Sequence, residues 1–596
     1  MKRTRSARSY LLVPAGGGGE GMGHLSRCIR LAGRLGGRVT LLASRLNAAS
    51  RALLREAAGR AGRKARPKLS SGLPPGARWD LIVLDGRRTS HEDLALLQRR
   101  GPVVCLDEGG EARDYSSYLV DTLPGPPGRG AANVSSPEYL DLPPRARKRP
   151  PAAFRRVLLS FGGEDRENLT EKLLDALVAD GLFAPSQITI VEGPLFRTRR
   201  WLPGIRVLRR VSKLPPILSH HDLVFTHFGM TCFESLAIGV PVILFNPSSY
   251  HALLSRAAGI PDIGVQAPDL ASLRRLLDDP GTLKAPVEDL NARIGAQRAG
   301  RLSAHLRMLF PRGTPGCPVC GRDGNKVIAR FPDRTYRACT GCGTMYMESF
   351  SANPPRYDAS YFSTEYRAQY GRTYLEDFES IKAVSRQRLS TLRKIAGERA
   401  EGAVVDVGCA YGPFLAAAQE SGLPCFGIDV AADAVNHVKR KLGIPALCAS
   451  FESVQRRLLP RRISAVTMWW VIEHFPDTDL VLRKASALLP PGGVLAFSTP
   501  NGRGVSARRN LGLFLEKSPS DHYTIFSPRG LRRLLANYGL ELRHVSVTGH
   551  HADRFPGILG RAAAASAAVS SVVAAASRAL GLGDTFEAYA VKGDQS

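Results

Sequence analysis

Short runs of apolar, often β-branched residues alternate with helical patterns along most of this chain. Short runs of such residues, bounded by turn-forming residues, are typical of buried strands. Strands alternating with helices in this way indicate parallel α/β units. We therefore predict two Rossmann-like domains, over residues 1–140 and 152–310. The predicted strands lie at 11–13, 39–42, 81–84 and 103–106 in the first domain, and at 157–160, 188–191, 223–226 and 242–245 in the second.

A segment rich in Pro, Gly and Arg separates these two series. It extends from Pro124 to Pro151 and contains Pro-Pro-Arg-Ala-Arg-Lys-Arg-Pro-Pro. Proline lacks the amide hydrogen that a helix interior or a central strand needs. We predict a linker here and a cleft between the two domains, where ligands of such folds bind.

Two Cys-x-x-Cys-Gly sequences follow Pro311, with 18 residues between Cys320 and Cys339. Each pair can place two thiolates on one tight turn, and the glycine after it relieves the backbone. Four thiolates suit a closed, structural zinc site. We predict a zinc ribbon over residues 313–348. Its expected zinc ligands are Cys317, Cys320, Cys339 and Cys342.

A third α/β series begins at Ala403, after a Tyr-rich connector over residues 357–374. Its first strand leads into the turn Gly408-Cys409-Ala410-Tyr411-Gly412 and then into a helix. The next strand ends in Asp429, about 20 residues past the turn, where a carboxylate accepts hydrogen bonds from ribose hydroxyls. The turn lacks a full G-x-G-x-x-G pattern, so by itself it suits an S-adenosylmethionine (SAM) enzyme or an NAD enzyme equally.

The downstream pattern distinguishes these alternatives. It consists of Trp470–His474, Leu488–Gly493, Asp521–Ser527 and a last strand at Thr585–Val591. Together with the glycine turn, these segments resemble the class I SAM-dependent methyltransferases, in particular the zinc-ribbon group of sugar and antibiotic pathways. The resemblance implies a class I methyltransferase domain over residues 349–596 with SAM as its cofactor. The SAM site that it implies consists of Asp406, Gly408, Gly412, Asp429, Phe451 and Glu452.

Methyl transfer aligns an acceptor atom with the methyl group and often uses a general base. His474 and His522 are the catalytic candidates here, since each ends or follows a strand at the carboxyl edge of the predicted sheet. The alternative for each is a hydrogen bond to backbone that orients a loop. Tyr361, Tyr366 and Tyr370 either close over the cofactor or pack the connector.

The first domain carries a glycine-rich segment, Gly16–Arg27, directly after its first strand. It contains no G-K-[ST] sequence, which excludes a P-loop. In the second domain, backbone amides at Gly229–Thr231 can hold a pyrophosphate at a helix start. Glu234, one turn further, can reach ribose hydroxyls.

These segments look like the GT-B glycosyltransferase superfamily, including the UDP-sugar hydrolase of pseudaminic acid synthesis and the N-acetylglucosaminyl transferase of peptidoglycan synthesis. The resemblance implies that His24 is a general base. An Asp that the hydrolases carry before the glycine stretch is replaced by Val13-Pro14-Ala15, so hydrolase, transferase and non-catalytic glycan binding all stay open. The implied nucleotide-sugar-binding residues are Gly23, Gly162, Gly163, Gly229, Thr231 and Glu234.

The formal net charge of +29 favours anionic partners. Arginines are scattered without interleaved aromatic residues, so we expect phosphate-bearing substrates and no nucleic acid. The ten cysteines do not form a secreted disulfide framework. The apolar run after the basic N-terminus is too short for a signal peptide, and Ala562–Ser577 is shorter than a membrane span. We expect a cytoplasmic protein, with peripheral membrane contact and oligomeric state left open.

The sequence thus predicts an α/β chain with two Rossmann-like domains of GT-B type, a zinc ribbon and a methyltransferase domain. The expected function is bifunctional: methyl transfer from SAM to a sugar or glycan, and hydrolysis or transfer of a UDP-linked sugar. One alternative is a methyltransferase with a non-catalytic carbohydrate-binding half. Another is a nucleic-acid methyltransferase that uses its basic charge and zinc ribbon for binding.

Overall fold

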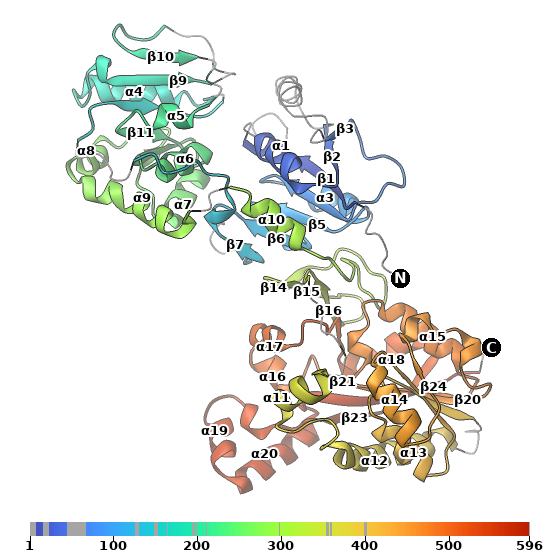
Figure 1. Ribbon diagram of the computed structural model, residues 1–596. Coiled ribbons are helices and arrows are strands. Elements are labelled where there is room, and N and C mark those ends of the chain that lie inside the picture. The colour runs from blue at the N-terminus through green and yellow to red at the C-terminus, as the bar shows by residue number, and fades with distance from the viewer. Residues whose placement is uncertain are drawn as a thin grey trace. The chain divides into compact units, whose positions relative to one another are not determined.

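The computed structural model divides the chain into two compact units, Met1–Leu309 and Phe310–Ser596 (Figure 1). Each unit has its own buried apolar clusters. The structure describes residues 7–15, 23–43, 67–124, 130–147, 153–163, 165–193, 196, 200–209, 211, 213–296, 299–352, 357, 360–397 and 402–594.

The first sheet of the first unit is parallel throughout, as predicted. Its central strands β4 and β5 are buried and, apart from Asp85 at the end of β4, apolar, which is what helices on both faces of a parallel sheet require. α1 (Gly23–Leu35) and α3 (His91–Gln98) connect strands of this sheet. The strand order is β3 (Lys68–Ser70), β2 (Arg38–Leu42), β1 (Ser9–Pro14), β4 (Leu81–Asp85), β5 (Val103–Leu106), β6 (Tyr118–Asp121) and β7 (Val134–Ser135).

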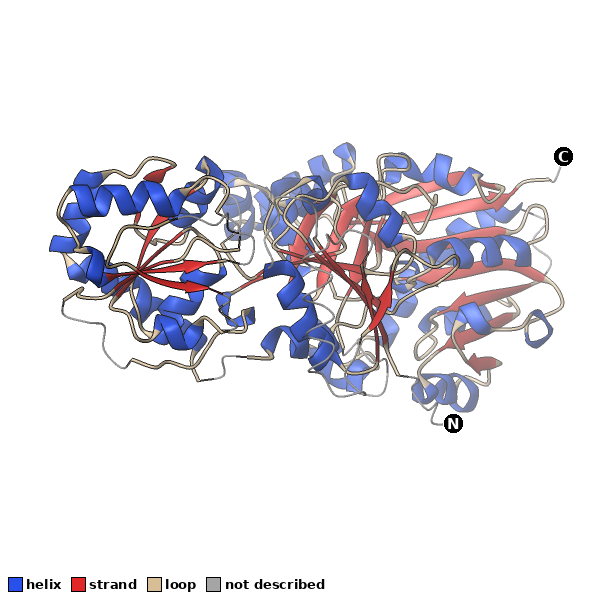
Figure 2. Cartoon of the chain, turned by 90° about the horizontal axis from the view of Figure 1, so that it is seen from above, coloured by secondary structure: helices blue, strands red, loops and turns tan. Residues whose placement is uncertain are grey.

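The second sheet of the first unit is also parallel, and Figure 2 shows it nearly edge-on with helices on both faces. Its order is β10 (Arg206–Arg209), β9 (Ile188–Glu192), β8 (Val157–Leu159), β11 (Leu223–Thr226), β12 (Val242–Asn246) and β13 (Asp262–Val265). Its helices are α4 (Leu169–Ala179), α5 (Pro215–Leu218), α6 (Met230–Ile238), α7 (Ser249–Ala257), α8 (Leu270–Asp278) and α9 (Pro280–Ile294).

The last helix of the first unit, α10 (Arg301–Met308), returns to the first sheet. Arg307 donates a hydrogen bond to the carbonyl oxygen of Arg34 in α1 at 2.7 Å. The side chain of His305 lies 3.1 Å from the Tyr118 hydroxyl on β6. Residues 301–308, which the sequence placed in the second domain, therefore pack on the first.

The predicted linker is only partly a linker. Of its residues, 125–129 and 148–151 lie outside the described part of the chain. Val134 pairs with Val120, so this segment adds β7 to the edge of the first sheet. A short 3-10 helix follows at Pro137–Tyr139, and Pro137 stands at its first position, where a missing amide hydrogen costs nothing.

The second unit begins with a small antiparallel sheet. Its strands are β14 (Val327–Phe331), β15 (Arg334–Ala338), β16 (Met345–Ser349) and β22 (Thr524–Ile525). β22 is contributed by a segment far along the chain, so the Cys-rich region shares a sheet with the C-terminal fold. The connector contains a π-helix at Tyr361–Glu365 and α11 (Tyr366–Tyr370).

The main sheet of the second unit has seven strands, of which only β24 runs opposite to the other six. Its order is β19 (Ala446–Cys448), β18 (Cys425–Asp429), β17 (Ala403–Val407), β20 (Ile463–Trp469), β21 (Val494–Pro500), β24 (Thr585–Lys592) and β23 (Leu540–Thr548). The last strand of the chain therefore inserts antiparallel between β21 and β23. The principal helices are α12 (Phe378–Ala396), α13 (Pro413–Glu420), α14 (Ala432–Lys441), α15 (Thr478–Leu488), α16 (Val505–Arg509), α17 (Leu511–Lys517) and α18 (Pro528–Ala536).

The Ala-rich stretch Ala562–Ser577 is divided between two helices. α19 (Gly557–Ala565) ends before Ser566, whose extended backbone starts α20 (Ala567–Leu580). Among the described residues, no helix combines the length and apolar character needed to cross a membrane.

Candidate functional site

The glycine turn after β17 adopts backbone conformations that favour small residues. Gly408, Ala410 and Gly412 have φ values of 71°, 48° and 85°. A Cβ at Gly408 would lie 2.3 Å from Val471 Cγ2, and one at Gly412 would lie 2.8 Å from Leu442 Cδ1. Small residues are thus required both by the turn and by the elements packed against it.

Asp429 lies at the end of β18, directly beside this turn. Its carboxylate accepts hydrogen bonds from the amides of Ala410 and Ala431, each at 2.8 Å. Burial raises the pKa of Asp429, although these amides oppose the change. The carboxylate predicted to bind ribose is therefore held in place partly by the glycine turn itself, through the amide of Ala410.

The other predicted SAM-site residues lie around the same strand ends. Asp406 is buried in β17 and accepts a hydrogen bond from the Thr467 hydroxyl at 2.6 Å, and burial raises its pKa to about 7. Phe451 is buried in a 3-10 turn with the Lys484 ammonium over its ring. Glu452 is half-buried, and the Ser450 hydroxyl donates to it at 3.1 Å.

The two candidate catalytic histidines of the second unit lie together, with ring centroids 4.6 Å apart. His474 ends a 3-10 turn after β20, and His522 lies just before β22. Asp521 lies 3.0 Å from His474 Nδ1, and the Tyr357 hydroxyl lies 2.9 Å from the same atom and donates to Asp521. Tyr357 and Asp521 thus orient the His474 ring.

The pKa values in this cluster are shifted in opposite directions. Burial alone lowers the pKa of His474, but the hydrogen bond and charge of Asp521 raise it above its ordinary value. Burial and the neighbouring His474 lower the pKa of His522 to about 3. Burial raises the pKa of Glu473 to about 7. Carboxylates and imidazoles with separated pKa values are typical of sites that move protons.

An aromatic cluster extends from His474 to the glycine turn. Tyr357 contacts Tyr361 at 4.9 Å between centroids, and Phe362 contacts both Tyr374 and Tyr411. Two of the predicted connector tyrosines, Tyr361 and Tyr366, join this cluster. The ring of Tyr366 lies 5.0 Å from that of Tyr374, and its hydroxyl group donates to Asp377 at 2.8 Å. The side chain of Tyr370 lies outside the described residues.

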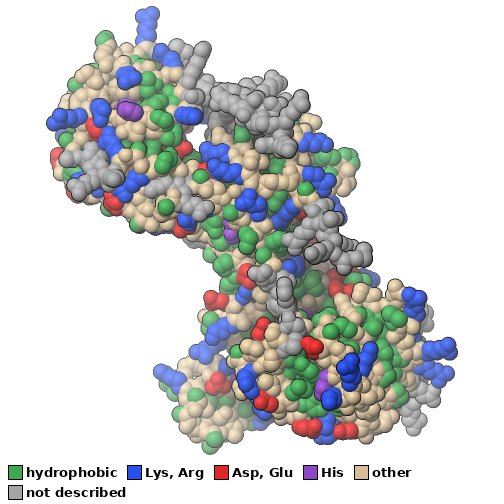
Figure 3. All heavy atoms as spheres, in the orientation of Figure 1, with side chains coloured by type: hydrophobic (Ala, Val, Ile, Leu, Met, Phe, Trp, Pro, Cys, Tyr) green, Lys and Arg blue, Asp and Glu red, His purple; other side chains and the backbone are tan. Residues whose placement is uncertain are grey.

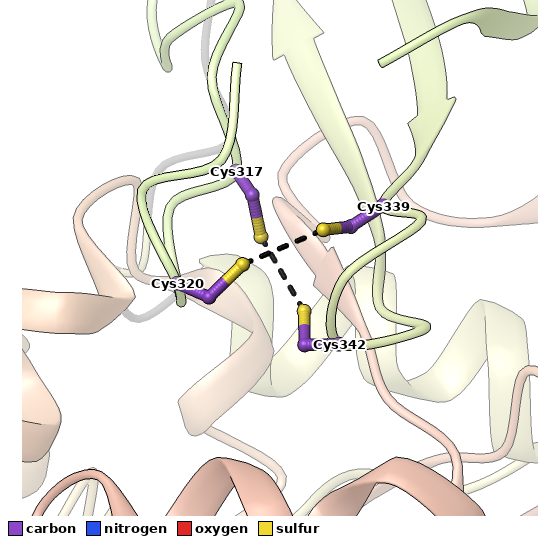
Figure 4. Close-up of side chains that lie close together, drawn as sticks. All are labelled: Cys317, Cys320, Cys339 and Cys342. Carbon is purple, nitrogen blue, oxygen red and sulfur yellow. Dashed lines mark hydrogen bonds between the residues drawn. The ribbon is translucent and has the colours of Figure 1, made fainter. Parts of the chain in front are cut away.

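The four predicted zinc ligands converge (Figure 4). The Sγ atoms of Cys317 and Cys342 are 3.6 Å apart, and those of Cys320 and Cys339 are 3.5 Å apart. Tetrahedral zinc with Zn–S distances of about 2.3 Å places its sulfurs about 3.8 Å apart, so the cluster fits the ion. Gly321 and Gly343 have φ values of 70° and 73°, which confirms that each knuckle needs its glycine.

In the first unit, His24 lies in the first turn of α1 and its Nδ1 is 2.6 Å from Asp85 Oδ1. Arg27 donates from Nε to the other oxygen of Asp85 at 2.7 Å and reaches Asp107. Burial favours neutral Asp85, yet Arg27 and His24 hold its pKa well below the ordinary value. The remainder of the predicted glycine segment, Gly16–Met22, lies outside the described residues.

The predicted nucleotide-sugar residues surround the start of α6. A Cβ on Gly23 would lie 3.9 Å from Met230 Cγ, so the first turns of α1 and α6 face each other. Gly229 precedes α6, and Thr231 and Glu234 lie in its first two turns. Burial raises the pKa of Glu234, and Arg30 of α1 partly offsets this.

The glycine turn after β8 lies close to the same region. A Cβ at Gly162 would lie 3.2 Å from His227 Nε2, and the carbonyl oxygens of Gly162 and Gly163 lie against Gly193. The structure therefore brings two of the predicted glycine turns together around His227, which the sequence did not nominate.

Sequence reasoning also missed Glu473, Asp521, Tyr357 and Asp85. Glu473 stands in the run Val471-Ile472-Glu473-His474-Phe475, and an acid flanked by apolar residues was the available signal. Asp85 ends β4 after four apolar residues, at the carboxyl edge where ligands of such sheets bind. Tyr357 lies far from His474 and Asp521 in sequence, so no local pattern indicated it.

A protein-family model described as a methyltransferase domain matches residues 380–545. The second unit contains a class I SAM-dependent methyltransferase domain. The matched residues include the glycine turn, Asp429 and His474.

Several curated relatives match part of this chain. The chain is 27% identical over 190 residues to the ubiquinone biosynthesis O-methyltransferase of Chromobacterium violaceum, covering 29% of this chain and 79% of that protein. It is 31% identical over 134 residues to the enzyme of the same name from Bordetella avium, covering 21% and 54%. An uncharacterized protein of Methanocaldococcus jannaschii is 30% identical over 100 residues, covering 15% of this chain and 20% of that protein.

Solved methyltransferases also match. A SAM-dependent methyltransferase from Archaeoglobus fulgidus aligns with 15% identity and a TM-score of 0.27, covering 38% of this chain and 98% of that one. Magnesium protoporphyrin IX methyltransferase from Synechocystis, with bound SAH, aligns with 13% identity and a TM-score of 0.27, covering 39% and 97%.

Proposed function

We propose that the second unit transfers the methyl group of SAM to a sugar or glycan, and that the first unit hydrolyses or transfers a UDP-linked sugar. The observation that carries the methyl-transfer part is Asp429, fixed by loop amides beside a turn of small residues. A carboxylate at this place accepts hydrogen bonds from ribose hydroxyls of a bound nucleoside.

On the acceptor side, His474 and His522 lie at the carboxyl edge of the same sheet as the turn. Val471, three residues before His474, contacts Gly408 of the turn, so the two parts of the site adjoin. A base there removes the proton of an acceptor hydroxyl as the methyl group is transferred. Asp521 supports this role because it holds the His474 ring in one orientation.

Calorimetric titration of the full chain with SAM tests the donor site. We expect the wild type to bind SAM and Asp429→Ala to lose most of its affinity, since the ribose hydroxyls lose their acceptor. Asp433→Ala, an exposed acid at the start of α14, is the matched control and should bind normally. Equal affinity in all three proteins would refute the proposed ribose site.

Support for the first unit comes from the facing starts of α1 and α6 and from the pair formed by His24 and Asp85. A carboxylate on one imidazole nitrogen leaves the other as a general base for water or an acceptor hydroxyl. Two helix starts supply amides for phosphate groups.

Titration with UDP tests this second part. We expect the full chain to bind UDP, Glu234→Gln to bind weakly, and the exposed control Glu288→Gln in α9 to bind as the wild type does. Glycan binding without UDP binding would favour the non-catalytic carbohydrate-binding half. Strong, salt-dependent binding of DNA or RNA would instead favour a nucleic-acid methyltransferase.

A further inference from the structure

Glu473 is a fully buried acid beside His474. Its exposed fraction is 0%, and neither carboxylate oxygen has a hydrogen-bond partner among the described residues. Burial disfavours its ionised form, and the neighbouring His474 offsets this only in part, so a further positive charge beside the carboxylate would stabilise it. Such an acid therefore points to a positively charged ligand.

Two imidazoles complete a ligand set around this acid. One nitrogen of His474, one nitrogen of His522 and one oxygen of Glu473 all lie within 4.8 Å of one another. The Nδ1 atom of His474 is occupied by Asp521 and Tyr357, which leaves Nε2 available. A carboxylate on the far nitrogen of a metal-binding imidazole fixes the ring and strengthens it as a ligand.

We propose that Glu473, His474 and His522 bind a divalent first-row transition-metal cation. Two imidazoles and one carboxylate leave open positions on such an ion for an oxygen ligand. Carboxylate and imidazole ligands suit manganese, iron, cobalt or zinc, whereas the four-thiolate cluster selects zinc.

The location of this site indicates its use. Val471 of the same turn contacts Gly408, so the cation would lie on the acceptor side of the methyl-donor turn. A hydroxyl oxygen bound to the cation releases its proton to solvent more readily, so with the cation bound the two histidines would act as its ligands and not as the general base. This role rests on the proposed function, whereas cation binding itself does not.

Titration of the full chain with Mn²⁺ tests the proposal, with the free Mn²⁺ signal followed by electron paramagnetic resonance. Thiolates bind Mn²⁺ poorly, so the cysteine cluster does not interfere. We expect the wild type to bind Mn²⁺ and to unfold at a higher temperature when Mn²⁺ is present. Glu473→Gln and His522→Ala should each weaken binding by about tenfold or more and lose the thermal shift.

Glu541→Gln and His544→Ala on the exposed face of β23 are the matched controls, and both should bind Mn²⁺ as the wild type does. Asp521→Asn should weaken Mn²⁺ binding by about tenfold without abolishing it. Asp521 orients the His474 ring and is not itself a ligand of the cation. Absence of Mn²⁺ binding in the wild type, or unchanged binding in His522→Ala, would overturn the proposal. Mn²⁺ binding by a chain that fails to bind SAM would refute the proposed function and leave the cation site standing.

Discussion

At Gly408 both the backbone and the packing exclude a side chain. Its φ of 71° is a left-handed conformation, and an added Cβ would lie 2.3 Å from Val471 Cγ2. Val471 belongs to the segment that leads to Glu473 and His474. One glycine therefore sets the separation between the methyl-donor turn and the acceptor-side cluster.

Gly408→Ala should lower the free energy of unfolding by about 1–3 kcal/mol, because Val471 must move and the backbone is strained. The same distortion of the turn should weaken SAM binding by about tenfold, which corresponds to about 1.4 kcal/mol of binding free energy. Denaturant unfolding and calorimetry measure the two effects. Gly422 has a similar φ of 73° and open space around it, so Gly422→Ala isolates the backbone strain. Identical losses in both variants would contradict the role given to Val471.

Asp406 should make stability depend on pH. Its pKa is about 7 in the folded chain and 3.8 as the reference value, so the folded state holds more protons between these pH values. Unfolding free energy therefore falls as pH rises from about 4 to 7, by up to about 4 kcal/mol. Between about pH 4 and 7, the melting temperature of Asp406→Asn should fall less steeply with rising pH than that of the wild type or of Asp433→Asn, whose substituted residue is exposed. Equal slopes in all three would be inconsistent with the burial of Asp406.

Sequence patterns identified the residues whose chemistry is local. The glycine turn, Asp429 and the cysteine knuckles each follow from a short segment. Asp85, which lies 61 residues from its partner His24, depends on how β4 is placed beside α1. Glu473 was present in a quoted segment, but only burial reveals that its carboxylate lacks a partner.

At the scale of elements, apolar runs predicted the central strands well because both faces of a parallel sheet are buried. Edge elements were harder to predict. β7 has only two residues, Val134–Ser135, and lies in a Pro-rich segment. The division of the Ala-rich helix at Ser566 reflects a serine that accepts a hydrogen bond from Val569 N to start α20, which alanine-rich composition does not reveal.

The cysteine knuckles should contribute to the stability of the second unit. Cys339→Ser should lower its melting temperature and its zinc content together, because metal-binding energy adds to folding energy. Cys448→Ser is the matched control, since Cys448 is exposed in the same unit. Melting curves with metal analysis of both variants measure this. A stable Cys339→Ser protein with full zinc content would contradict the proposed metal site.

At the scale of the whole molecule, the chain consists of two units, each with its own core. Lys and Arg side chains of the described residues are dispersed over the face shown in Figure 3, and they do not gather in one patch there. Their scatter along the sequence already predicted this. The sequence also indicated the parallel α/β series, but it did not predict that α10 packs against α1.

Residues 1–309 and 310–596 should each fold when produced alone, because each has its own core. The full chain should show two unfolding transitions in calorimetry. SAM should raise the temperature of only the transition that residues 310–596 also show, since a ligand stabilises the unit that binds it. This division would be contradicted if the full chain unfolded in a single transition, or if the separate halves were insoluble.

The pairing of β22 with β16 has a consequence for the living cell. Thr524 pairs with Tyr346, whose hydroxyl group donates to Pro315 beside the first knuckle, and His522 lies two residues before Thr524. Damage to the thiols would release that strand and, with it, His522. If His522 has the role proposed above, oxidation of these cysteines would therefore disturb the His522 side of the site more than the glycine turn beside Asp429.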